Sequence, residues 1–277
     1  MDQSRGYLYV ATGEKFIEEA TRSAKSLRRV SDDVSIAIAA DSSVDNEVFD
    51  EKITIKDPAY GFADKINNLD RSPFDRTIFL DSDTNIFHDI SNLFDLLEHF
   101  DIAAVPNNDH TSRETFDLES VPDCFPEYNT GVLVYRTEVM SNFAPKWNSF
   151  YEKDHPHDQP SFREALFKSD LRLSPLTPEY NFMFRYPQHI IGKVKVSHGR
   201  LGDVPYFSPI RKDETDIIKS VNKSSKSRIY LPHPLFGPVV KTHMDPSFHF
   251  RRSVTNRGIL GTASEVLSRI KQRLARK

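Results

Sequence analysis

RTIFLDSD, residues 76–83, is a run of apolar and β-branched residues that stops at two aspartates. Arg76–Leu80 predicts a short buried strand, because a brief continuous apolar run bounded by polar residues is typical of a sheet interior. With 25 aspartates in 277 residues, chance alone gives about two Asp-x-Asp triplets, so the spacing by itself is weak evidence. The position after a buried strand is more informative, since it places Asp81 and Asp83 at the mouth of a sheet, where ligands bind.

Upstream of this segment, short apolar runs alternate with stretches of helical periodicity. The sequence predicts strands at Tyr7–Ala11, Val34–Ala40 and Ile53–Ile55, and helices at Glu14–Val30 and Phe62–Leu69. Such alternation indicates an α/β fold with a mostly parallel, Rossmann-like sheet that is covered by helices on both faces. The second strand ends at Asp41, at the same edge of the sheet as Asp81.

The pattern continues downstream with a second set of elements. We predict a helix capped by Ser91, strands at Ile102–Val105 and Val132–Tyr135, and a helix at Pro160–Leu166. Over Asn107–Pro126 we predict a long surface loop of the kind that often carries binding function. The length suits one large unit. We therefore expect a single catalytic domain over residues 1–261, followed by a separate helix over residues 262–277.

Composition and charge exclude several function classes. The 37 basic and 40 acidic residues give a net charge of −3, which does not favour nucleic-acid binding. Cys124 is the single cysteine, so no internal disulfide is possible and a reducing compartment fits best. The opening residues MDQSRG do not resemble a secretion signal, and no apolar run approaches the length of a membrane span. These features predict a cytoplasmic protein.

The C-terminal segment, residues 262–277, has the pattern of a basic amphipathic helix. Four apolar residues share one helical face, and five basic residues against Glu265 give a local charge of +4. Such a helix can hold a protein on an anionic membrane surface. The alternative is a helix that packs on the domain and leaves its basic face in water.

Asp81-Ser82-Asp83 is the strongest candidate for a chemical role. Two carboxylates on one tight turn can bind a divalent cation that bridges two phosphates of a nucleotide diphosphate. The competing interpretation is a turn that the aspartates merely cap.

Four segments in order resemble the nucleotide-sugar-dependent glycosyltransferases of the A-type fold, and most closely the glycogenin-like glycosyltransferase family 8. They are YLYVATGEKF (7–16), KINNLDRSPFDRTIFLDSDTNIFHDISNLF (65–94), YNTGVLVYR (128–136), and HDQPSF (157–162) together with LTPEYN (176–181). The resemblance implies a metal-dependent transfer of a hexose from a nucleotide sugar, with uridine as the expected base. It also implies retention of the anomeric configuration and a glycan, lipid-linked or protein acceptor.

The resemblance assigns donor-site roles position by position. Ala11-Thr12-Gly13 would line the nucleotide, Asp41 would lie near the base or ribose, and Lys65 would contact the phosphates. Asp81-Ser82-Asp83 would hold the metal through its two carboxylates, and His198 would be the third ligand. A mixed oxygen and imidazole set favours Mn²⁺, with Mg²⁺ as a possible substitute.

The same resemblance assigns the sugar and acceptor side. Asn129, Thr130 and Gly131 would border the sugar and acceptor, and Asp158 and Gln159 would lie beside the anomeric carbon. The expected partners are a nucleotide-sugar donor and a carbohydrate-type acceptor, with no nucleic acid.

The sequence departs from the family after His198, where the usual His-Phe-x-Gly and the later Lys-Pro-Trp are missing. Three basic residues are candidates to replace the missing lysine: Lys193, Lys195 and Arg200. His243 is a rival third ligand, because it also follows a β-branched pair.

Several of these residues have simpler alternatives. Lys65 would be a solvated helix residue, and Asp41 would cap a turn. Asn129 and Gly131 would form a bend that admits a backbone, and Asp158 would be a helix N-cap. For the whole chain, the alternatives are a catalytically inactive sugar-binding module and, less favoured by the glycine-poor turn ATGEKF, a nucleotidyltransferase.

Overall fold

The computed structural model describes residues 4–31, 33–107, 118–151, 157–203, 213–224, 226–232 and 239–242. The strands are β1 (Arg5–Ala11), β2 (Ile36–Ala40), β3 (Glu51–Thr54), β4 (Arg76–Leu80), β5 (Thr84–Ile86), β6 (Ile102–Pro106), β7 (Tyr128–Arg136), β8 (Leu173–Pro175), β9 (Phe182–Met183), β10 (Gln188–Ile190), β11 (Val196–His198), β12 (Arg228–Leu231) and β13 (Val239–Thr242). The α-helices are α1 (Glu14–Arg28), α2 (Phe62–Ile66), α4 (Thr137–Phe150), α5 (Gln159–Phe167) and α6 (Glu214–Asn222). Short 3₁₀ helices are η1 (Leu69–Arg71), η2 (Ser91–Glu98), η3 (Pro178–Tyr180) and η4 (Leu201–Asp203).

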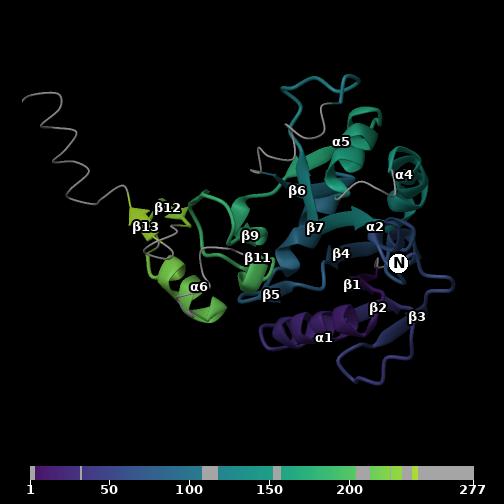
Figure 1. Ribbon diagram of the computed structural model, residues 1–277, viewed down its shortest axis with the longest axis horizontal. Helices are drawn as coiled ribbons and strands as arrows, with labels where there is room; N and C mark the ends of the chain where they lie inside the picture. The colour runs from purple at the N-terminus through teal and green to yellow at the C-terminus, as the bar shows by residue number, and fades with distance from the viewer. Residues whose placement is uncertain are drawn as a thin grey trace, which may run out of the picture.

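The main sheet has seven strands in the order β3-β2-β1-β4-β7-β6-β8. All neighbours pair in parallel except β7, which runs antiparallel to both β4 and β6. The prediction of a mostly parallel α/β sheet is therefore confirmed. β1, β2 and β4 end together, so residues that follow them meet at one edge of the sheet (Figure 1).

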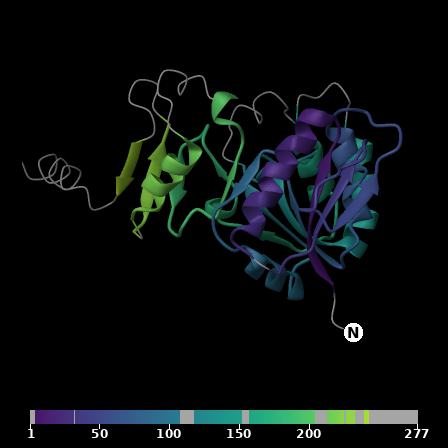
Figure 2. The ribbon, with the colours of Figure 1, turned by 90° about the horizontal axis from the view of Figure 1, so that it is seen from below.

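Two apolar cores cover the two faces of this sheet. On one face, alternate residues of the strands pack against α1 and η2 in a cluster that includes Tyr9, Ala24 and Leu93. On the other face, the intervening residues pack against η1, α4 and α5 around Trp147 and Phe162. Figure 2 shows α1 lying along the main sheet, with α6 and the three-stranded sheet β10-β12-β13 set to one side. The central strands are apolar on both faces because both faces are buried.

A three-stranded sheet, β5-β11-β9, connects the main sheet to the C-terminal part of the described chain. β11 pairs antiparallel with β5, and His198 lies opposite Thr84 in the register. β5 begins directly after the Asp81-Ser82-Asp83 turn. This pairing therefore brings a histidine from late in the chain to the carboxylates that follow β4.

The elements differ from their predicted bounds in ways that have physical causes. β7 begins at Tyr128, so Asn129-Thr130-Gly131 lies inside a buried strand and not before one. The prediction of Ser91 as a helix cap was wrong, because Ser91 is the first residue of η2 and its hydroxyl donates to Asp89. The helix predicted over Phe62–Leu69 ends at Ile66, and the 3₁₀ helix η1 begins at Leu69 after two intervening residues.

Three predictions fall wholly or partly on residues outside the described ranges. They are the amphipathic helix over residues 262–277, the rival ligand His243, and the surface loop over Asn107–Pro126, of which residues 108–117 lie outside. Within the described part of the chain, no helix is both long and apolar enough to cross a membrane.

Candidate active site

A pocket of about 490 Å³ opens at the edge where β1 and β4 end. Of the residues predicted from the sequence, eleven line it: Ala11, Thr12, Lys65, Asp81, Ser82, Asp83, Asn129, Thr130, Asp158, Gln159 and His198. Gly13, Asp41 and Gly131 are not among its described lining residues. The fold therefore gathers most of the predicted site residues around one cavity.

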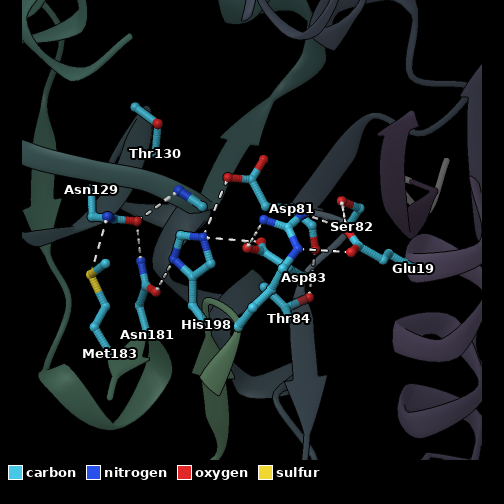
Figure 3. Close-up of polar contacts among 12 residues, drawn as sticks. Glu19, Asp81, Ser82, Asp83, Thr84, Asn129, Thr130, Asn181, Met183 and His198 are labelled. Carbon is cyan, nitrogen blue, oxygen red and sulfur yellow. Dashed lines mark hydrogen bonds and ion pairs between the residues drawn. The ribbon is translucent and has the colours of Figure 1, made fainter. Parts of the chain in front are cut away.

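Asp81, Asp83 and His198 form one cluster within this pocket, as Figure 3 shows. One ligand atom from each lies within 4.8 Å of the others. His198 Nε2 is 3.3 Å from Asp83 Oδ1 and 3.6 Å from Asp81 Oδ2. Two carboxylates and one imidazole nitrogen that converge in this way match the mixed oxygen and nitrogen donors of a divalent metal site.

The charges in this cluster shift one another's protonation. Burial opposes ionisation of Asp83, but the neighbouring His198 and Arg200 hold the pKa of its carboxyl far below the usual value. Burial raises the pKa of Asp81, and Lys65 counteracts only part of that rise. For His198, burial favours the neutral ring, but Asp83 and Asp81 outweigh it and raise the pKa of the imidazole. The two carboxylates thus favour the protonated form of His198.

Lys65 is buried and not solvated. Its Nζ lies 3.0 Å from Asp158 Oδ2 and 3.2 Å from Asp81 Oδ1, and it donates to Thr130 Oγ1 at 2.9 Å. Burial lowers the pKa of its ammonium, but Asp158 and Asp81 outweigh that effect and raise it. Lys65 therefore stays charged and joins the carboxylate of Asp81 to that of Asp158.

Asp158 occupies the N-cap position of α5, but its side chain makes no capping hydrogen bond. The carboxylate instead accepts from Thr130 Oγ1 at 2.9 Å and pairs with Lys65. The simple N-cap interpretation is therefore wrong for the side chain. Gln159, the next residue, is the first of α5 and lines the pocket beside it.

Gly131 lies against the face of His198. A Cβ built on Gly131 would come within 2.1 Å of His198 Cε1, closer than any real side chain tolerates. Asn129 Oδ1 accepts the Gly131 N–H at 2.9 Å. Gly131 in β7 therefore makes room for the imidazole ring of His198, and not for a neighbouring backbone.

The opening turn is held by two carboxylates. Asp64 accepts from Thr12 Oγ1 at 2.8 Å and from the N–H groups of Ala59 and Tyr60. Asp41 Oδ1 accepts the N–H of Gly13 at 2.9 Å, where φ of 91° favours glycine. Asp41 therefore caps this turn in the structure, and its role at the base or ribose stays a prediction.

Arg200 and Glu19 were not predicted as a pair. Arg200 Nε donates to Glu19 Oε1 at 2.7 Å, and Arg200 Nη1 lies 3.4 Å from Asp83 Oδ2. The hydrogen bond from Arg200 lowers the pKa of Glu19. Of the three basic candidates, Arg200 lines the pocket, whereas Lys195 donates to the Asp89 carbonyl and to Asn92 Oδ1, outside the pocket lining. Glu19 lies in the middle of α1 and carries no local sequence signal of this contact.

The site also carries an excess of negative charge. Four carboxylates, of Glu19, Asp81, Asp83 and Asp158, share two permanent cations, Lys65 and Arg200. The remaining two negative charges equal the charge of one divalent cation, and Asp81, Asp83 and His198 supply ligand atoms for it. The donor set and its charge therefore fit a divalent metal.

No family model and no curated relative matches the sequence. Solved structures do match the fold. Galactosyltransferase LgtC in complex with donor and acceptor sugar analogs is 13% identical with a TM-score of 0.55, over 78% of this chain and 94% of that chain. Mouse xyloside xylosyltransferase 1 is 14% identical with a TM-score of 0.50 over 72% and 98%. The bifunctional glycosyltransferase WbbM is 13% identical with a TM-score of 0.53 over 81% and 52%. The chain therefore has the A-type glycosyltransferase fold.

Proposed function

We propose that this protein is a metal-dependent glycosyltransferase that moves a hexose from a UDP-linked donor to a carbohydrate-type acceptor, with retention at the anomeric carbon. The observation that carries the proposal is the convergence of Asp81, Asp83 and His198 beside a pocket at the carboxyl edge of the sheet. The A-type fold and the four sequence segments that resemble glycosyltransferase family 8 support it. The neighbour LgtC was solved with donor and acceptor sugar analogs, which supports a nucleotide sugar as the donor.

In this proposal Asp81, Asp83 and His198 would hold one divalent cation, preferably Mn²⁺, which would supply positive charge for the diphosphate of the donor. Arg200 lies beside Asp83 and supplies a second positive charge on the same side of the pocket. Its guanidinium matches the geometry of phosphate oxygens. We therefore assign to Arg200 the phosphate contact that a lysine makes in the related family.

Asp158 is the proposed group beside the anomeric carbon. Its side chain is only 1% exposed, yet it lines the pocket and is fixed by Lys65 and Thr130. A carboxylate held in this way faces developing positive charge on a sugar ring without reorganising during the reaction. Gln159 and Asn129 also line the pocket and are proposed to contact the sugar.

The first test is release of nucleoside diphosphate from a panel of nucleotide sugars in the presence of Mn²⁺. Wild type is compared with Asp83→Ala and with Asp95→Asn, a matched control whose carboxylate is 67% exposed and pairs with Arg5 away from the pocket. We expect one donor to be cleaved in a reaction that needs both Mn²⁺ and Asp83. Asp95→Asn should behave as wild type.

If no donor is cleaved but one binds with Mn²⁺, the chain is a sugar-nucleotide-binding module. If none binds at all, the glycosyltransferase proposal fails. Cleavage that survives Asp83→Ala would show that the metal does not bind at this cluster.

A further inference from the structure

A chain of hydrogen bonds runs from the backbone of β7 to the imidazole of His198 (Figure 3). Gly131 N–H donates to Asn129 Oδ1 at 2.9 Å, and Asn181 Nδ2 donates to the same oxygen at 2.7 Å. Asn181 Oδ1 then lies 2.9 Å from His198 Nδ1. Asn181 and Asn129 are each 2% exposed, so water does not compete for these contacts.

The backbone N–H of Gly131 fixes the direction of every hydrogen bond in this series. A backbone N–H only donates, so the Asn129 atom that faces it is the oxygen. An oxygen only accepts, so Asn181 must turn its amide nitrogen toward Asn129 and its own oxygen toward His198. His198 Nδ1 must then carry a proton. The assignment rests on the network and not on a choice of amide orientation.

The other nitrogen of the ring points to the carboxylates. Nε2 lies 3.3 Å from Asp83 Oδ1, so a neutral ring with its proton on Nδ1 directs its Nε2 lone pair to the place where the carboxylates converge. The opposite tautomer would set an imidazole lone pair against the Asn181 oxygen in a site where His198 itself is only 9% exposed. Two buried acceptors that face each other lose a hydrogen bond and repel.

We infer that Asn181 is a positioning residue that fixes the tautomer and ring orientation of His198 for cation binding; this rests on the cation site of the proposed function. Metal-binding histidines commonly donate their second ring N–H to a fixed acceptor, and loss of that acceptor typically lowers metal affinity by about 10- to 100-fold. Asn181 is well placed for the task. The residue after it, Phe182, pairs with Ser197 in the parallel β9–β11 ladder, next to His198.

The test has two readouts that do not depend on turnover. The first is the ¹⁵N chemical shifts of the His198 ring in the metal-free protein, at a pH well above that at which the ring protonates. The second is Mn²⁺ affinity, measured by electron paramagnetic resonance. We expect wild type to carry the proton on Nδ1, and Asn181→Leu to lose that preference and to bind Mn²⁺ about 10- to 100-fold more weakly.

Two further variants separate positioning from stability. Asn181→Asp keeps an acceptor for Nδ1–H and should retain the tautomer and most of the affinity. Asn222→Leu is the matched control, because Asn222 also joins buried backbone, accepting from Val194 N–H and donating to the Val194 carbonyl, but away from His198. It should lower stability and leave both readouts unchanged.

A wild-type ring with its proton on Nε2 would overturn the inference, even if Asn181→Leu fails to fold. Equal Mn²⁺ affinity in folded Asn181→Leu would also overturn it. If wild type shows the Nδ1 proton but binds no Mn²⁺, the metal-dependent function fails while the tautomer assignment stands, so the two failures are distinguishable.

Discussion

Gly131 and His198 are in such close contact that a single methyl group on Gly131 would overlap the imidazole, at 2.1 Å from Cε1 and 2.5 Å from Nδ1. Gly131 does not have a positive φ, so its backbone conformation is open to other residues. The absence of a side chain at this position is therefore required by the ring and not by the strand.

Gly131→Ala is expected to displace His198 and to lower Mn²⁺-dependent turnover about a hundredfold, because displacements of about 1 Å have effects of this size. The measurement is turnover and Mn²⁺ affinity, with Gly202→Ala as the control. A Cβ on Gly202 meets nothing within 4 Å, and Gly202 does not line the pocket. Wild-type Mn²⁺ affinity in Gly131→Ala would show that the ring does not hold its metal-binding position through this contact.

Lys65→Met should destabilise the fold by about 3–5 kcal/mol, because it leaves the buried carboxylate of Asp158 and the partly buried carboxylate of Asp81 without their cation. Urea denaturation measures the change. Lys168→Met removes a partly exposed pair with Glu164 and should cost less than about 1 kcal/mol. Equal effects of the two substitutions would contradict the central role of Lys65 in the charge balance.

Arg200→Ala should raise KM for the donor about tenfold or more, since it would remove the proposed charge-assisted contact to phosphate. The control is Lys195→Ala, whose ammonium stacks on Tyr180 and bonds to Asn92 outside the pocket. Steady-state kinetics over a range of donor concentrations distinguishes the two variants. An unchanged KM in Arg200→Ala would show that Arg200 does not contact the donor phosphates.

Glu214→Gln should stabilise the protein at neutral pH. Burial raises the pKa of Glu214 above its ordinary 4.5, although Ser197 and Asn85 bond to the carboxylate and oppose the rise. The folded state therefore binds a proton at Glu214 more tightly than the unfolded chain does. The stability that this proton contributes is lost as the pH rises through the folded pKa of Glu214. The amide of the Glu214→Gln variant does not ionise, so the variant does not lose this stability as the pH rises.

Urea midpoints of wild type and Glu214→Gln should consequently converge below pH 4.5 and separate above the folded pKa. A midpoint of Glu214→Gln below that of wild type at neutral pH would show that the ionised carboxylate makes net stabilising contacts.

The sequence predicted the central strands well, because burial on both faces makes each of them an uninterrupted apolar run. Arg76–Leu80 matches β4 at both ends for this reason. The direction of β7 was not predictable, since an apolar strand of either direction has the same pattern. Its early start at Tyr128 was missed because Asn129 and Thr130 are polar, and both are buried only through their bonds to other site residues.

The candidate site was predictable where chemistry and strand ends coincide, as at Asp81 and Asp83. It was not predictable where one partner is remote. Glu19 meets Arg200, 181 positions away, and has no neighbouring motif that signals the contact. Asn181 was part of a segment that resembled the family, yet its contact to His198 depends on the β9–β11 pairing, which lacks a local pattern.

The reversed direction of β7 has a consequence for how such a chain can diversify. The parallel strands deliver the metal-side carboxylates at their ends, whereas β7 delivers Asn129 and Thr130 at its beginning, so the connection from β6 enters the site from the opposite direction. A change of length in that connection would act at the edge of the sheet beside Asn107, which lines the pocket, and would leave the parallel pairings of β1, β2, β3 and β4 unchanged.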